Sequence, residues 1–147
     1  MDDIVVFLDK IYEEAMDLAA EARNYVALGQ KKNSHDHLPP RLRVVASYEI
    51  MRLTTRLTQS IAWLLLRRAV ESSEIASRQF IEADEILTAR DICLGTAGQD
   101  NMEMPEELRS LLERSHRLYE RILHMDEVMK NRPAGGPGGE LEHAQGS

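Results

Sequence analysis

The chain has 147 residues, of which 43% are hydrophobic and 29% charged, a composition that predicts one globular domain and excludes a wholly disordered or collagen-like chain. Its formal net charge of -7 disfavours general binding to nucleic acids, and its single cysteine, Cys93, excludes an intramolecular disulfide and a zinc site built on several cysteines. Because the longest apolar run, Ile61–Leu66, is far shorter than the roughly 20 residues of a membrane helix, and the start Met1–Asp3 is unlike a signal peptide, we expect a cytoplasmic protein without a membrane segment.

The first predicted element is an amphipathic helix over residues 3–28, where apolar side chains recur every three or four residues. Asp2 or Asp3 is expected to cap its N-terminus, and Gly29 to end it in the left-handed conformation. The polar residues 30–38 predict a loop.

A second helix is predicted over residues 40–70, with Pro40 at its first position, where the missing N–H group costs nothing. Near its end the segment Ile61–Leu66 is apolar on all sides, so a second surface must cover it. Residues 75–94 of the same chain could provide this cover. We favour instead a self-complementary dimer or partner interface formed by Ile61, Trp63, Leu64, Leu65 and Leu66.

The rest of the chain predicts a short helix near residues 77–87, an irregular connection to Met104, and a third long helix over residues 105–130. Glu113 and Arg117 are expected to pair one turn apart on that helix. The sequence thus predicts an all-α fold: an antiparallel three-helix bundle over residues 1–131, with the short additional helical segment and a flexible Gly/Pro-rich tail over residues 132–147.

Candidate catalytic and metal-binding residues are few. Glu113 and His116 have the spacing of a di-iron ligand pair, but the second copy that such a site needs is not evident. His35 and His37 lie in the polar loop without further ligands nearby, and Cys93 lies between apolar neighbours like a buried small residue. We therefore expect no catalytic, cofactor-binding or metal site, and no enzyme.

Charge is unevenly distributed along the chain. Residues 1–29 carry seven acidic and two basic side chains, whereas residues 40–70 carry six arginines and one glutamate. The arginines could form a charged face for a partner, or contact phosphates in a nucleic-acid-associated protein, which is our alternative function. The interpretation that we favour is pairing with the acidic first helix. The residues assigned to the charged face are Arg52, Arg56, Arg67 and Arg68.

Residues 47–70, which read SYEIMRLTTRLTQSIAWLLLRRAV, resemble the central helix of the RcdA family of bacterial regulators of CtrA degradation. Further similarity lies in Glu74–Ile75, which looks like the turn after that helix, and in Met104–Arg109 and Ser115–Leu118, which look like the third helix. The resemblance extends over about residues 4–130 and is strongest in the second helix. The tail after Lys130 matches no family pattern.

The resemblance implies a three-helix bundle that forms a homodimer and has no catalytic site of its own. It implies an adaptor or scaffold that acts in regulated proteolysis in the cytoplasm, with the cell pole as one location. The implied partners are the ClpX component of the ClpXP protease, a CpdR-type response regulator, a CtrA-like cell-cycle substrate and a co-adaptor that binds cyclic-di-GMP.

Overall fold

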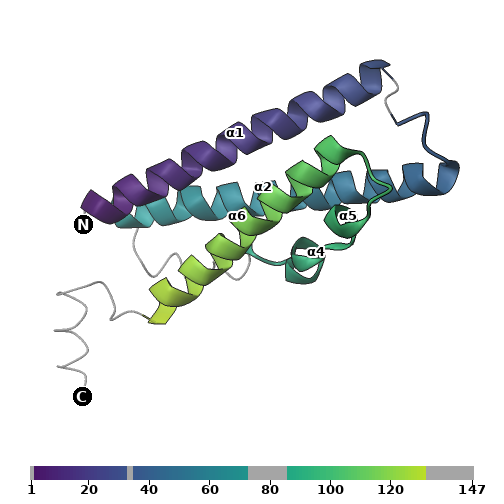
Figure 1. Cartoon of the computed structure of the whole chain (residues 1–147). Coiled ribbons are helices and arrows are strands. Elements are labelled where there is room, and N and C mark those ends of the chain that lie inside the picture. Colours follow the sequence, from purple (N-terminus) through teal and green to yellow (C-terminus); the bar gives the residue numbers. More distant parts are fainter. Residues whose placement is uncertain (1, 33–34, 73–85, 132–147) are drawn as a thin grey trace, which may run out of the picture.

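The computed structural model describes residues 2–32, 35–72 and 86–131, and the elements in these ranges are helices. They are α1 (Asp2–Lys32), α2 (Pro40–Glu71), α4 (Arg90–Leu94), α5 (Ala97–Asp100) and α6 (Glu106–Asn131). Figure 1 shows that α1 and α2 run antiparallel, that α6 packs across both, and that α4 and α5 lie beside α2 and α6 on the side away from α1. The predicted all-α bundle is therefore confirmed.

Helix α1 buries the predicted stripe. Its core side chains point toward α2 and α6 and recur every three or four residues, as Leu8, Ile11, Ala15, Leu18, Ala22 and Tyr25. The prediction that Gly29 ends the helix is wrong, because α1 continues to Lys32. A glycine inside a helix costs about 1 kcal/mol relative to alanine but blocks no backbone hydrogen bond, so the helix can pass through it.

Helix α2 begins as predicted. Pro39 is its N-cap and Pro40 occupies the first turn, and the N–H of Arg43 donates to the carbonyl of Pro39 at 3.0 Å. The helix ends at Glu71, within one residue of the predicted boundary.

The segment before the third long helix is more regular than predicted. Residues 90–94 and 97–100, expected to be irregular, form α4 and α5. These short helices are held by contacts with α2 and α6, which the local sequence does not reveal. The helix expected at residues 77–87 lies almost wholly outside the described residues, and so does the tail at residues 132–147.

The core lies where α1, α2 and α6 meet. Trp63 of α2 is fully buried there, and its indole N–H donates to Asp126 Oδ1 of α6 at 2.9 Å. Lys130 Nζ lies 3.1 Å from the other oxygen of the same carboxylate. This polar contact inside an otherwise apolar core fixes how α2 and α6 pack against each other. The apolar side chains around it include Leu53, Leu57, Leu64, Leu108, Leu111, Leu112, Leu118 and Ile122.

Candidate protein-interaction surfaces

The apolar segment Ile61–Leu66 is mostly covered within the chain. Trp63 and Leu64 have no exposed surface, and Ile61 and Leu66 are partly buried against the same core. The assignment of Trp63 and Leu64 to a dimer surface is therefore wrong for this fold, because both side chains pack into the bundle of their own chain. Only Leu65, which is 47% exposed, presents a large apolar side chain of this segment to solvent.

Three arginines of α2, Arg52, Arg56 and Arg67, are turned inward as well. Arg56 is fully buried, and its guanidinium donates to the carbonyls of Cys93 at 2.7 Å and Leu112 at 2.8 Å, to the hydroxyl of Ser115 at 3.1 Å, and to the carbonyl of Gly95. Burial lowers the pKa of Arg56 to about 10, with the charge of Arg52 adding to the effect, so the guanidinium remains a cation near neutral pH. It joins α2 to α6 and to the segment that carries α4 and α5.

Arg52 makes a similar connection one turn earlier. Its Nε lies 2.9 Å from Glu49 Oε1 in a buried ion pair, and its Nη1 donates to the carbonyl of Ile92. Glycines at residues 95 and 98 allow this approach, because a Cβ at Gly95 would meet the Arg52 guanidinium and one at Gly98 would lie 2.7 Å from Glu49 Cγ.

The expected charged partner face is therefore wrong for three of its four arginines. Arg52, Arg56 and Arg67 are buried, and Arg67 lies 3.7 Å from Glu71 of the next turn. Arg68 is partly exposed and pairs with Asp9 of α1 at 3.0 Å, which realises the predicted pairing of α1 with α2 at one position. Burial of Arg52, Arg56 and Arg67 also removes three of the six arginines on which the nucleic-acid alternative rests, since a buried guanidinium cannot contact phosphates.

This inward placement leaves an uncharged outer face on α2. The three charged residues between positions 44 and 66, which are Glu49, Arg52 and Arg56, are all buried. We call the solvent-facing side of α2 over residues 44–66 the outer face. Its exposed side chains are Val44, Ser47, Tyr48, Met51, Thr54, Thr58 and Leu65.

The outer face exposes more apolar surface than a solvated helix side usually does. Val44 is 70% and Met51 68% exposed, and Tyr48 lies beside them with its ring under the Arg52 guanidinium at 5.2 Å. The sequence-based prediction did not include Val44, Tyr48 and Met51. An uncharged stripe on α2 opposite the core stripe could have been identified from the spacing of these residues alone.

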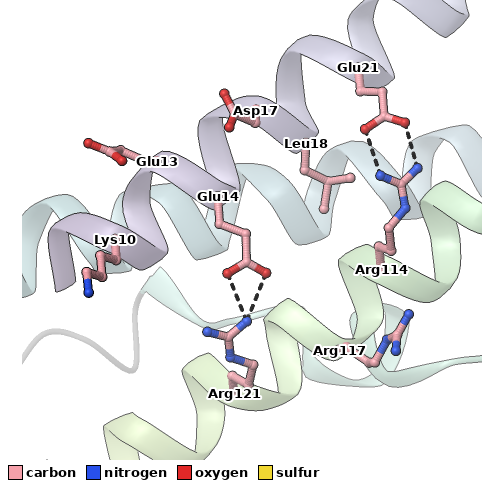
Figure 2. A pocket seen from close by; sticks show the side chains of 9 residues that line it. All are labelled: Lys10, Glu13, Glu14, Asp17, Leu18, Glu21, Arg114, Arg117 and Arg121. Atoms are coloured by element: carbon pink, nitrogen blue, oxygen red, sulfur yellow. Dashed lines mark hydrogen bonds and ion pairs between the residues drawn. The ribbon is translucent and has the colours of Figure 1, made fainter. Parts of the chain in front are cut away.

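A groove of mixed charge runs between α1 and α6. Figure 2 shows Glu21 facing Arg114 and Glu14 facing Arg121 across a hollow of about 620 Å³, whereas Glu13 and Asp17 point away from these two arginines. Both Glu21 oxygens accept hydrogen bonds of 2.7 Å from Arg114, and Arg121 Nη1 lies 2.9 Å from Glu14 Oε1. The Arg114 guanidinium lowers the pKa of Glu21. The acidic side of α1 thus pairs mainly with α6 rather than with α2.

The remaining candidate residues have local partners. Glu113 pairs with Arg117 at 3.4 Å, as predicted. His116 is partly buried, and its Nδ1 lies 3.2 Å from Glu120 Oε1. Burial raises the pKa of the Cys93 thiol, which disfavours the reactive thiolate. In residues 2–32, 35–72 and 86–131, no group of three or more potential ligands could hold a metal ion.

The described helices include none that is long and apolar enough to span a bilayer. This finding concerns residues 2–32, 35–72 and 86–131.

Comparison with known proteins identifies related chains. The sequence model of a family described as "Protein of unknown function (DUF1465)" matches residues 5–141. The structure is similar to the crystal structure of RcdA from Caulobacter crescentus CB15, with a TM-score of 0.61 and 34% sequence identity over 83% of this chain and 89% of the RcdA chain. No match is found among curated proteins.

Proposed function

Since this chain belongs to the family described as DUF1465 and is an RcdA-family protein, we propose that it is a non-enzymatic adaptor that helps deliver a CtrA-like cell-cycle regulator to the ClpXP protease. The similarity to RcdA supports a role of this kind in general. The protease, the regulator and the route of delivery are our proposal.

The outer face of α2 is the observation that carries this proposal. A solvated helix side usually bears charges, whereas this one buries its charges and exposes Val44, Tyr48, Met51 and Leu65. Depletion of charge together with exposed aromatic, methionine and aliphatic side chains is typical of the centre of protein–protein interfaces. A chain with such a surface is suited to binding other proteins.

The groove between α1 and α6 supplies the charged contacts that select a partner. Glu13 and Asp17 point away from the arginines that hold Glu14 and Glu21, so their carboxylates remain available to basic side chains of a bound protein. We assign this groove to the delivery partners implied by the family: ClpX, a CpdR-type response regulator, the substrate and a co-adaptor that binds cyclic-di-GMP. The adaptor would act as a homodimer in the cytoplasm, with the cell pole as one location.

A reconstituted degradation assay tests the proposal. Purified ClpXP, CpdR-type regulator and CtrA-like substrate are combined with and without this chain, and the substrate remaining is followed over time. We expect faster loss of substrate when the chain is present. Equal rates with and without it would overturn the delivery role.

Charge-reversal variants test whether delivery depends on the groove between α1 and α6. The double variant Glu13→Lys with Asp17→Lys reverses both free carboxylates and should slow delivery. A matched control changes two exposed acidic residues elsewhere, Asp91→Lys with Glu127→Lys, and should leave the rate unchanged. Equal rates for the two double variants would show that delivery does not use the groove.

A further inference from the structure

We propose that a hollow between the start of α1 and the C-terminal half of α6, beside Phe7, binds residues 140–142 of the same chain, with Leu141 as the apolar anchor. Residues 140–142 lie outside the described ranges. This inference goes beyond the proposed function and does not depend on it.

The hollow is large enough for an apolar side chain and the backbone on either side of it. Its volume is about 500 Å³ and its surface is mainly apolar. The ring of Phe7 is 48% exposed, and Met125 is partly buried against the core. Such a surface is suited to take up an apolar side chain. We call it the Phe7 hollow, and it is lined by Phe7, Arg117, Glu120, Arg121, His124 and Met125.

The rim of the Phe7 hollow is more basic than acidic. It carries Arg117, Arg121 and His124 against the single carboxylate of Glu120. Each arginine already pairs with one glutamate, but Arg121 reaches Glu14 through Nη1 alone. A guanidinium has five N–H donors, so these arginines can also bind carboxylates of a segment in the hollow. The chemistry of the site therefore fits an apolar side chain flanked by acidic residues.

Residues 132–147 contain one segment of this kind. They read RPAGGPGGELEHAQGS, in which Leu141 is the only large hydrophobic residue and has Glu140 and Glu142 as its neighbours. The anchor and the two carboxylates thus match the apolar floor and the basic rim of the Phe7 hollow.

The length of the chain between α6 and Leu141 also fits. In Figure 1 the C-terminal end of α6 and the N-terminal end of α1 lie at the same end of the bundle. About 15 Å of helix separates Asn131 from Arg121 at 1.5 Å per residue. Residues 132–140 connect Asn131 to Leu141, and a Gly-rich chain of that length has a root-mean-square end-to-end distance of about 17 Å.

This match of linker length to distance favours binding within one chain. A segment tethered by a short linker of matching length has an effective concentration on the order of 1 mM, so a modest intrinsic affinity is enough to fill the site. The Phe7 hollow shares Arg117 and Arg121 with the charged groove between α1 and α6. A protein that binds this end of the groove would therefore compete with residues 140–142.

A spin label close to Leu141 tests the proposal in the full chain. The label is attached to the variant Gln145→Cys, since the native Cys93 is buried, and the signals of isotope-labelled methionine methyl groups are compared before and after the label is reduced. We expect the active label to broaden the signal of Met125, which lines the hollow, and to leave unchanged that of Met102, which precedes α6 at its other end. A Met125 signal that is not broadened overturns the proposal.

Variants separate docking from the nearness that the tether alone produces. In the labelled chain, Leu141→Ser should lower the ratio of docked to undocked molecules by about 10-fold or more and restore the Met125 signal. Phe7→Ser should do the same, whereas Val6→Ser, a change at the neighbouring 52% exposed residue outside the hollow, should leave the broadening in place. Circular dichroism checks that the variants keep their helices, and Leu141→Ser remains decisive if Phe7→Ser unfolds.

Two further results would contradict the proposal. Broadening that persists in Leu141→Ser would show that the tether alone brings the label near Met125. Broadening that appears only when spin-labelled chains are mixed with separate isotope-labelled chains would show that the segment binds another copy and not its own chain. Neither measurement involves the protease, so a failure of the delivery role and a failure of this inference are distinguishable.

Discussion

Arg56 connects α2 to two other segments through a fully buried guanidinium. The guanidinium donates to three backbone carbonyls and one hydroxyl on two separate segments. It therefore supplies hydrogen-bond donors to buried carbonyls at and just after the end of α4, where regular backbone hydrogen bonding stops. Sequence reasoning placed this arginine on the surface, since an arginine on a helix is usually solvated. Its acceptors lie 37 to 59 residues away in the chain, and no local pattern reveals such partners.

Replacing Arg56 should therefore be costly. We expect Arg56→Met to lower the free energy of unfolding by about 3 kcal/mol, because the buried carbonyls of Cys93 and Leu112 and the Ser115 hydroxyl lose the hydrogen bonds that the guanidinium donates. Arg41→Met is the matched control, since Arg41 is exposed and its contact is a 3.8 Å ion pair with the exposed Glu103, and it should change the free energy by less than about 0.5 kcal/mol. Urea denaturation measures both, and equal losses would contradict the role given to Arg56.

His35 should make stability depend on pH. Its Nε2 lies 2.6 Å from the hydroxyl of Tyr25, and burial, with the charge of His37 adding to it, lowers the pKa of His35 below 6.5. Because the unfolded chain then takes up this proton more readily than the folded chain, stability should fall as the pH is lowered through about 6.5.

Two histidine variants test whether His35 causes this pH dependence of stability. The loss of unfolding free energy between pH 7.5 and pH 5.5 should be smaller in His35→Gln than in the wild type. It should be unchanged in His124→Gln, which alters an exposed histidine of α6. A wild-type pH dependence retained in His35→Gln would assign the effect to other groups.

At the scale of elements, α2 turns the charged residues of positions 44–66 inward and an uncharged side outward. The bounds of α2 and α6 and the core stripe of α1 follow from sequence, because proline positions and apolar periodicity are local signals. The two short helices and the burial of Arg52, Arg56 and Arg67 do not, because both depend on contacts between distant segments. The absence of charge on the outer face could be detected in the sequence. The interface was predicted instead at Ile61–Leu66, because this segment is the longest apolar run.

The docking of α5 on α2 should be sensitive to the size of residue 98. Gly98→Ala would place a methyl group against the buried Glu49, whose ion pair with Arg52 prevents it from moving freely. We expect a loss of about 2 kcal/mol in thermal or chemical unfolding. Ala97→Ser changes the adjacent exposed residue and should have little effect, so equal losses would show that the close approach at Gly98 does not matter.

For the whole molecule, opposite charges on α1 and α6 favour one arrangement of the bundle. The Glu21–Arg114 and Glu14–Arg121 pairs connect residues 93 and 107 positions apart, although their side chains remain about half exposed. Such pairs contribute little to stability, and their main effect is to disfavour wrong packing partners. The charge pattern of the sequence predicts pairing of acidic α1 with α2, but α2 buries three of its arginines, so α1 pairs with α2 at Asp9–Arg68 and otherwise with α6.

A double-mutant cycle on Glu21→Gln and Arg114→Gln should give a coupling free energy below about 1 kcal/mol, falling further as salt is added. Chemical denaturation of the wild type, both single variants and the double variant measures it. A coupling of several kcal/mol would mean that the groove is much less accessible to solvent than the structure indicates.

The most direct test of the adaptor role is the half-life of the CtrA-like regulator in cells that carry or lack the gene for this chain, followed by pulse-chase labelling. The account predicts a longer half-life without the gene, restored by the wild-type gene but not by one encoding Glu13→Lys with Asp17→Lys. An unchanged half-life in cells that lack the gene would contradict it.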